Sequence, residues 1–250
     1  MAALLHGWCG DVTLVLCEPG FAEQRSTRKR QPVAHVAVLD AWRRAAHRTE
    51  VASLERVPQH VVVLAEPVVV AWLHAMPASV RLAAVYVYEH ECVDSMTLVA
   101  ACPESLDALQ LVSLRLAALP ESLGQLTSLT TLDLIACSSL TGLSESNFEL
   151  AALTTLALGC CTSLTGLPES MAQLTALSTL ELRRCASLTG LPDSMGQLTA
   201  LTALVLKHCC SFTGLPVSVG QLTALTMLHL SACDSLTGLP ESTGQLAALT

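Results

Sequence analysis

The chain reads LTALSTLELRRCASLTGLPDSMGQ from residue 174 to residue 197, and LTALTMLHLSACDSLTGLPESTGQ from residue 222 to residue 245. Units of this kind, each twenty-four residues long, follow one another over the C-terminal half of the sequence. Five of them begin at Leu126, Leu150, Leu174, Leu198 and Leu222, and a partial sixth unit begins at Leu246. A repeat at a fixed interval is typical of a solenoid, in which each unit forms one turn of the chain.

Six leucines recur in each unit, at relative positions 1, 4, 7, 9, 15 and 18, with Phe212 replacing one of them. No straight helix or strand points all six toward one side, whereas a coil that turns once per unit does. Stacked coils then share a continuous aliphatic core. The Leu-x-x-Leu-x-Leu stretch predicts a short strand, and the strands of neighbouring coils would pair about 4.8 Å apart in a parallel sheet. The Gly-Leu-Pro-Glu-Ser stretch predicts a turn into a short helix or 3-10 segment on the outer side.

The repeat resembles the leucine-rich repeats of plant intracellular disease-resistance receptors and of Ras-pathway scaffold proteins, in the motif L-x-x-L-x-L-x-x-C-x-S-L-T-G-L-P-E-S-x-G-Q. The match is close over residues 126–249 and loose over residues 108–125, where a compressed unit has strand-like Leu111, Leu114 and Leu116. The resemblance implies an α/β horseshoe: a leucine-rich-repeat solenoid with a parallel concave β-sheet and short helical or 3-10 convex segments. We assign this domain to residues 105–250. The nucleotide-binding and signalling modules of those receptors are not evident in the sequence.

The N-terminal region, residues 1–104, is less regular. Short β-rich runs lie at residues 12–16, 33–39, 61–64 and 85–88, and a helix is predicted at residues 41–51. Apolar pairs in these runs lie about one repeat length apart, which fits degenerate coils. A small α/β cap over the open end of the solenoid fits equally well, and an independent functional domain is a further alternative. Some cover is required, because a bare first coil would expose an unpaired strand and apolar side chains.

The charge of the chain argues against nucleic-acid binding. The formal net charge is −8; residues 1–107 hold twelve acidic and nine basic residues, and residues 108–250 hold nine acidic and four basic ones. Neither part has the basic character of a nucleic-acid-binding protein. The one basic run, from Arg25 to Arg30, lies in a polar stretch and is interpreted as a solvated loop.

The sequence predicts neither a secretory signal nor a membrane span. The first five residues are apolar but lack a positively charged start. The most apolar window, residues 57–76, is interrupted by His60, Glu66, Pro67 and His74, whereas a span needs about 20 mostly apolar residues. The eleven cysteines are an odd number, and no Asn-x-Ser/Thr acceptor occurs. We therefore expect a cytoplasmic protein in a reducing compartment.

One cysteine per unit forms a column through the repeats, three residues after the last leucine of each predicted strand. Its members are Cys137, Cys161, Cys185, Cys209 and Cys233. Many such repeats place an asparagine here, and we predict a structural role for the buried thiols. Disulfides between adjacent coils are an alternative that a reducing compartment disfavours. A metal site is a weaker alternative, because metal ligands usually come in closely spaced pairs and the column supplies one sulfur per coil.

The residues that flank the strand leucines vary most from unit to unit, and their side chains would point away from the core into the concave face. Stacking would bring the charged ones of neighbouring units together in one polar, mostly cationic patch. We predict that this patch binds an acidic segment of a partner protein; the alternative is that its charges only keep the sheet soluble. The candidate contact residues are Asp133, Glu181, Arg183, Arg184, Lys207, His208 and His229.

The sequence favours a protein-interaction module over an enzyme. The motifs G-x-x-x-x-G-K-S/T, H-E-x-x-H, G-x-S-x-G and G-x-G-x-x-G do not occur, so we predict no catalytic residue and no cofactor. The expected function is to bind a partner protein in intracellular signalling or defence-like recognition, with no nucleic-acid or membrane partner. Two alternatives stay open: a substrate-selecting arm of a ubiquitin-ligase-like enzyme or adaptor with its activity in residues 1–105, and a non-functional fragment of a larger protein. The open last coil also predicts end-to-end self-association.

Overall fold

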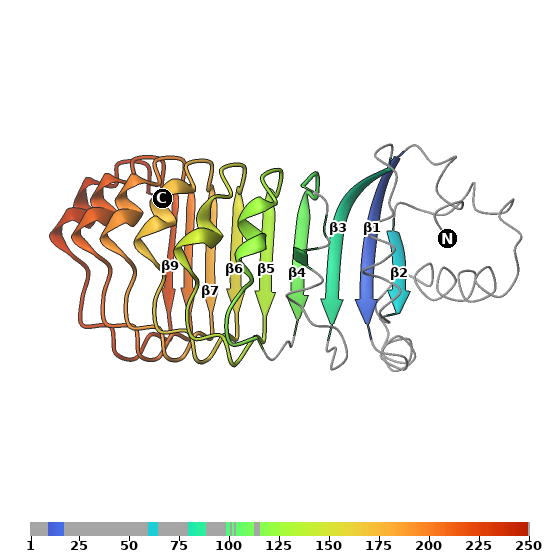
Figure 1. The fold of residues 1–250 in the computed structure, drawn as a ribbon. Coiled ribbons are helices and arrows are strands. Elements are labelled where there is room, and N and C mark those ends of the chain that lie inside the picture. Colours follow the sequence, from blue (N-terminus) through green and yellow to red (C-terminus); the bar gives the residue numbers. More distant parts are fainter. Residues whose placement is uncertain are drawn as a thin grey trace, which may run out of the picture.

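A computed structural model describes residues 10–17, 60–64, 80–88, 99–100, 102, 104–112 and 116–249 of this chain. The strands of these residues lie side by side in one parallel sheet (Figure 1). They are β1 (Gly10–Cys17), β2 (His60–Leu64), β3 (Val80–Tyr88), β4 (Ala108–Val112), β5 (Thr131–Ile135), β6 (Thr155–Gly159), β7 (Thr179–Arg183), β8 (Ala203–Lys207) and β9 (Met227–Ser231). The strand expected at residues 33–39 and the helix expected at residues 41–51 lie outside the described residues.

The repeats stack as one coil per unit, with their strands in register. From β4 to β9 each strand pairs in parallel with the strand of the next coil. The equivalent leucines therefore line up rung by rung, in the series Leu132, Leu156, Leu180, Leu204 and Leu228. This confirms the predicted leucine-rich-repeat solenoid with its open parallel sheet.

The leucines fill a continuous core between the sheet and the convex segments. In the coil that starts at Leu174 the strand leucines Leu180 and Leu182 are completely buried, and so are Leu177 and Leu188. Burying such a side chain contributes roughly 1.5–3 kcal/mol, so each added coil is stabilised mainly by its neighbours. In the last coil, Leu228 and Leu230 are only partly buried, because β9 is an edge strand of the sheet. End-to-end self-association through this edge remains a prediction.

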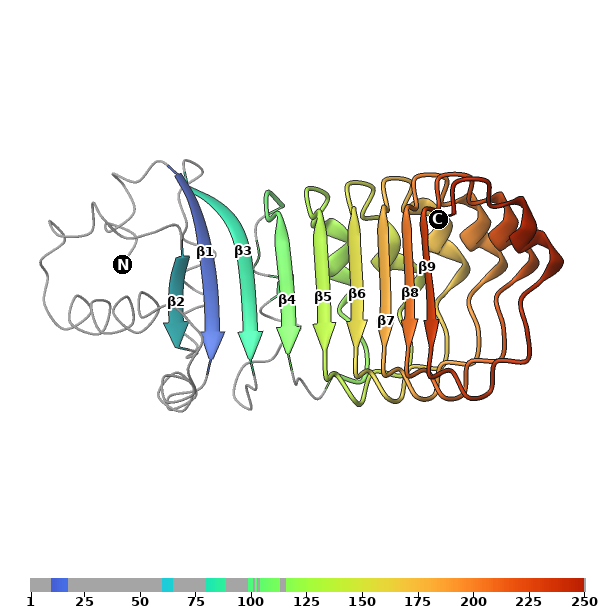
Figure 2. The same cartoon turned by 180° about the vertical axis from the view of Figure 1, so that it is seen from behind.

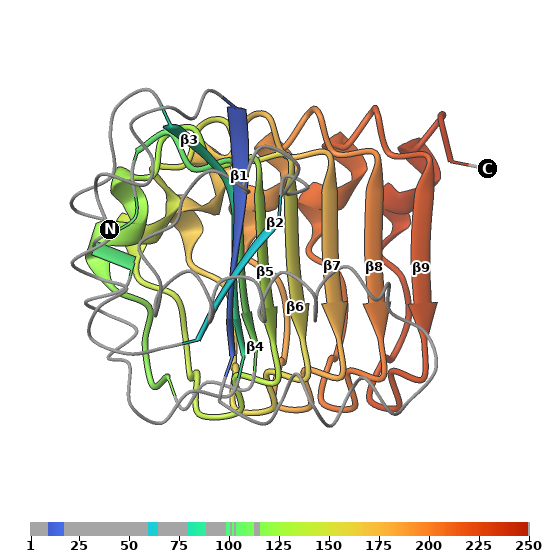
Figure 3. The same ribbon diagram turned by 90° about the vertical axis from the view of Figure 1, so that its right-hand side faces the viewer.

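Short 3-10 helices form the convex side, and consecutive ones lie in a row behind the sheet (Figures 2 and 3). A proline directly precedes five of them, as at Pro168 and Pro192. The backbone of each of these prolines is extended, and no side-chain hydrogen bond is made at this capping position. The helices are η3 (Glu121–Gln125), η4 (Glu145–Phe148), η5 (Glu169–Gln173), η6 (Asp193–Gln197), η7 (Val217–Gln221) and η8 (Glu241–Gln245). The predicted convex 3-10 segments are thus confirmed.

Carboxylates tie these short helices to one another. The backbone N–H of Ser170 donates to Oε2 of Glu145 in the preceding coil at 3.0 Å, and the N–H of Ser194 donates to Oε2 of Glu169 at the same distance. The N–H groups in the first turn of a helix have no partner within the helix, so an acceptor from the neighbouring coil satisfies them. We call these contacts carboxylate staples.

Hydroxyl groups link the coils along two further lines. Before the strands, Thr154 Oγ1 donates to the carbonyl of Thr130, and Ser178 Oγ donates to the carbonyl of Thr154, both at 3.0 Å. In the Thr-Gly-Leu turns, Thr189 Oγ1 donates to the carbonyl of Thr165 at 3.3 Å, and Thr213 repeats the contact with Thr189 at 3.0 Å. The recurrence of hydroxyl residues at these two positions of the repeat is therefore explained by bonds between coils.

The N-terminal strands join the same sheet in a different order. β1 lies between β2 and β3 and is parallel to both, and β3 pairs with β4. In stacked coils each strand would pair with its neighbours in the sequence, whereas here β2 and β3 flank β1. An α/β cap accommodates this order, and the division at residue 104 remains a prediction.

The first unit of the regular series uses different leucines from those expected. β4 places Leu109 beside Leu132 and Leu111 beside Leu134, so Leu109 and Leu111 are the inward strand residues. Of the expected set, Leu111 is correct, Leu114 lies outside the described residues, and Leu116 is buried after the strand has ended. The interval from β4 to β5 is therefore one residue shorter than the interval between later strands. The strand itself keeps the usual length.

Candidate partner-binding surface

The sheet presents three rows of side chains on its concave face. Residues of β5 and β6 alternate between half-buried and buried, because successive side chains of a strand point to opposite faces. The outward positions of β7 are Thr179, Glu181 and Arg183. The register then extends each row across the sheet, so that residues of equal relative position become neighbours about 4.8 Å apart.

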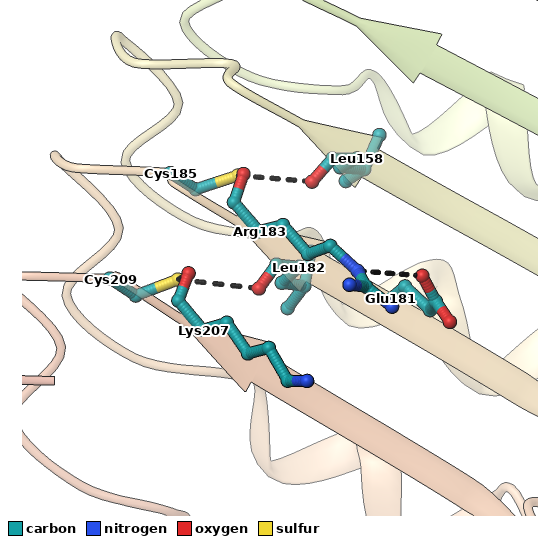
Figure 4. Close-up of polar contacts among 7 residues, drawn as sticks. All are labelled: Leu158, Glu181, Leu182, Arg183, Cys185, Lys207 and Cys209. Carbon is teal, nitrogen blue, oxygen red and sulfur yellow. Dashed lines mark hydrogen bonds and ion pairs between the residues drawn. The ribbon is translucent and has the colours of Figure 1, made fainter. Parts of the chain in front are cut away.

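Four basic residues meet where β7 and β8 end. Arg183 and Lys207 are the last residues of these two strands and lie side by side in register (Figure 4). Arg184 and His208 follow them directly and are exposed. We call these four residues the basic cluster.

Arg184 and His208 belong to a turn, and not to the strands as the sequence suggested. Both have a left-handed backbone, with φ of 57° and 55°. The N–H of Arg184 donates to the carbonyl of Lys207 at 2.7 Å, and the N–H of His208 donates to the carbonyl of Ser231 at 2.8 Å. A left-handed conformation is unfavourable for residues with a Cβ, so these bonds to the next coil offset local strain.

An acidic residue reaches into the basic cluster from the middle row. Nε of Arg183 lies 2.9 Å from Oε2 of Glu181, and the Arg183 side chain is 48% exposed (Figure 4). The hydrogen bond to Glu181 and its negative charge raise the pKa of the Arg183 guanidinium above its usual value. Because the pair is exposed, it contributes little to stability, and its main effect is to neutralise one of the cluster's charges.

Two candidate residues lie apart from the basic cluster. In the middle row, Ala157 separates Asp133 from Glu181, and Val205 separates Glu181 from His229. Asp133 accepts a hydrogen bond from the side-chain amide of Gln110 on β4. Burial raises the pKa of the Asp133 carboxyl; the Gln110 bond opposes this shift, and the charge of Glu181 adds to it.

The expected single cationic patch is therefore divided. The structure brings together Arg183, Arg184, Lys207 and His208, with Glu181 as a counter-charge. It leaves Asp133 two strands away from Glu181 in the middle row, and these two residues are the acidic ones of that row. An acidic partner segment laid across the whole sheet would meet repulsion there, whereas an anion placed on β7 and β8 would not.

The cysteine column lies behind this surface, on the core side of the turn. The thiol of Cys185 donates to the carbonyl of Leu158 in the preceding strand at 3.4 Å, and Cys209 repeats the contact with Leu182 at 3.5 Å (Figure 4). The other members make the same contact with the preceding strand, namely Cys137 with Leu111, Cys161 with Leu134 and Cys233 with Leu206.

The thiols of this column differ in acidity. A hydrogen bond with Cys185 lowers the pKa of Cys209 to about 7, whereas the pKa values of two other members are raised. A hydrogen bond with Cys137 and burial raise the pKa of Cys161, and a hydrogen bond with Cys209 and burial raise the pKa of Cys185. Cys161, Cys185 and Cys209 are free thiols. Buried thiols that bond to the preceding strand suit the structural role predicted for the column.

Two features are absent from the described part of the chain. No group of three or more His, Cys, Asp or Glu side chains there is arranged to hold a metal ion. No helix among the same residues has the length and apolar character needed to cross a membrane.

The left-handed turn residues could not be predicted from residue type. They are Ala136, Cys160, Arg184, His208 and Ala232, which share no residue type that favours this conformation. The carboxylate staples were also missed, because their donors are backbone N–H groups, although the recurrence of an acidic residue after the proline could have suggested them.

Comparison with known proteins finds structures with a similar fold. No protein-family model matches the chain, and no curated protein matches it by sequence. Among solved structures, the leucine-rich repeat domain of the type III effector XopL is 23% identical, with a TM-score of 0.51, over 90% of this chain and 96% of that domain.

Longer proteins also match, over part of their length. The Leptospira interrogans LRR protein LIC12759 is 21% identical with a TM-score of 0.35, over 67% of this chain and 53% of that one. The Arabidopsis receptor kinase HAESA, solved with the peptide hormone IDA and the co-receptor SERK1, is 19% identical with a TM-score of 0.46, over 77% of this chain and 36% of that one. All these neighbours are leucine-rich-repeat proteins, and the XopL domain, at 23% identity, shows the fold alone.

Proposed function

We propose that this leucine-rich-repeat chain is a protein-interaction module that binds a partner protein on its concave face, at the basic cluster. The observation that carries the proposal is the contrast between constant and variable positions. Most of the recurring leucines lie in the core, and the recurring cysteines and turn threonines bond to the neighbouring coil. The ends of β7 and β8 and the turn after β7 instead carry Arg183, Lys207 and Arg184, and the other units have no basic residue there.

Electrostatics gives the binding surface its character. Charged groups on a surface raise the rate of encounter with a complementary partner and exclude like-charged ones. A cationic site on a chain of formal net charge −8 would select anionic groups of a partner. A role in intracellular signalling or defence-like recognition follows from the resemblance of the repeats and is part of the proposal.

The test is capture of partners by the full chain with and without the basic cluster. We would replace Arg184 and Lys207 with Glu, which changes the net charge by −4. The matched control introduces the same change at four exposed threonines that begin the coils, away from the cluster. These control positions are Thr127, Thr175, Thr199 and Thr223.

Partners bound by the wild-type chain should be lost from the cluster variant and retained by the control. If the two variants capture the same partners as the wild type, the concave basic cluster is not the binding surface. The alternative of a ubiquitin-ligase-like activity concerns residues 1–105, most of which lie outside the described residues.

We also propose a reducing, intracellular location, which the unbridged thiols of Cys161, Cys185 and Cys209 support. These thiols lie on adjacent coils, where an oxidising compartment would favour cross-links. Maleimide labelling of the denatured protein, taken directly from cells, should modify all eleven cysteines. Protected cysteines that react only after reduction would contradict this location.

A further inference from the structure

The positive charge of the repeats is gathered at one point. Residues 116–249 contain nine acidic residues and three basic ones, a formal net charge of −6. All three basic residues, Arg183, Arg184 and Lys207, belong to the basic cluster, and His208 adds an imidazole. The site is therefore a local cation on an anionic surface, and it is only two coils wide.

Small residues flank the basic cluster on both sides. β6 contributes Gly159 and Cys160 at the equivalent positions, and β9 contributes Ser231 with Ala232. A Cβ placed on Gly159 would meet only the side chain of Ile135, at 3.9 Å. An anion can thus approach the cationic side chains from either side along the row without displacing large side chains.

The net charge of the basic cluster matches one compact, doubly charged group. Glu181 offsets Arg183, which leaves the charges of Arg184 and Lys207 available. A phosphate monoester carries about −1.5 to −2 charges at pH 7 and has three acceptor oxygens, and guanidinium and ammonium groups are its usual protein donors.

A run of partner carboxylates fits this site less well. Side chains on one side of an extended segment recur about every 6.6 Å, which exceeds the distance between two coils. A longer acidic run would reach Asp133 and Glu181 on the middle row, where like charges repel it. A single phosphate at Arg184 and Lys207 stays away from Asp133, and the Glu181 carboxylate nearby is already paired with Arg183.

We propose that the basic cluster binds a phosphorylated serine or threonine side chain of the partner protein. The proposal rests on the proposed function and names the chemistry that the concave face recognises. Arg184 and Lys207 hold the phosphate oxygens, and His208 borders them on the turn.

The experiment compares three pools of immobilised dodecapeptides that carry phosphoserine, serine or glutamate at the central position and random uncharged residues elsewhere. Binding of the full chain is followed by surface plasmon resonance. Charge-assisted hydrogen bonds of this kind predict about tenfold more binding to the phosphoserine pool than to either other pool. The excess should disappear in the Arg184→Glu/Lys207→Glu variant and persist in the four-threonine control.

A second variant, Arg184→Gln/Lys207→Gln, removes the charges without reversing them and guards against misfolding of the first. Circular dichroism confirms that each variant is folded. Equal binding to the phosphoserine and glutamate pools would overturn the proposal, and so would phosphoserine binding that survives both variants.

Failure of this proposal is distinguishable from failure of the proposed function. Cell extract is treated with a phosphatase before partners are captured. Partners that require the basic cluster but are still captured after this treatment would leave the protein-binding function standing and refute the phosphate requirement. Loss of those partners after treatment is the result that we expect.

Discussion

The convex side of the solenoid offers a sharp test of how closely the coils approach. A Cβ built on Gly196 would lie 2.7 Å from the backbone carbonyl oxygen of Ser218 and 2.8 Å from its Cβ, whereas ordinary contacts begin at 3.4 Å. The carbonyl belongs to η7, so relief requires a shift of about 0.7 Å between two coils. The equivalent residue of η5 is Ala172, so such a shift is attainable. We therefore expect Gly196→Ala to destabilise the fold by about 1–2 kcal/mol, in the lower part of the overpacking range.

Two matched glycines should respond in the opposite direction. Gly190, in the same coil, and Gly244, at the same relative position in the last described 3-10 helix, have nothing within 4 Å of a built Cβ. Alanine there restricts only the unfolded chain and should stabilise the protein by about 0.4–1 kcal/mol. Urea unfolding followed by circular dichroism measures all three variants. The close-approach argument fails if Gly196→Ala is as stable as the wild type, or if Gly244→Ala is equally destabilised.

Three further substitutions test individual contacts. Val217, 72% exposed, occupies the place of the stapling glutamates, so Val217→Glu should accept the N–H of Ser242 and raise the free energy of unfolding by about 0.5–1 kcal/mol, whereas Val217→Lys should give no gain. The pKa of Asp133 is raised in the folded state, so the charged carboxylate destabilises the fold at pH values above this pKa. The destabilisation vanishes at pH values below the pKa of the unfolded chain, about 3.9. Asp133→Asn, which keeps an acceptor for Gln110, should stabilise the protein by less than about 1 kcal/mol at pH 7 and leave it unchanged near pH 3; a gain that is equal at both pH values would contradict the burial argument. Cys185→Ala removes a completely buried thiol and its bond to the preceding strand, and should cost about 1–2 kcal/mol in chemical denaturation; an unchanged midpoint would show that the column is not structural.

The constant interval of the repeat made the stack predictable. Because Leu156, Leu180 and Leu204 recur every twenty-four residues, one coil per unit was the only way to bury them together, and the register follows from it. The unit before Leu126 lacks this regularity, and there the sequence indicated Leu114 and Leu116 in place of Leu109. The leucine pattern therefore predicted the strands correctly only where several units share the same spacing.

The concave surface was predictable in composition but not in arrangement. The outward positions of β7 and β8 follow from strand alternation, which is why Arg183 and Lys207 were identified. The ion pair between Glu181 and Arg183 depends on side-chain conformation, which a repeat pattern does not encode. The left-handed turn at Arg184 and His208 is imposed by the bonds to the next coil against local preference, so no propensity signals it.

Binding on the concave face is tested by photo-crosslinking of the full chain in cells, with a benzophenone amino acid in place of a single residue. At Ser231, which borders Lys207 on the concave face, we expect a discrete adduct with a partner protein. At Gln197, exposed on the convex side, we expect none. Adducts that form at Gln197 and not at Ser231 would contradict binding on the concave face.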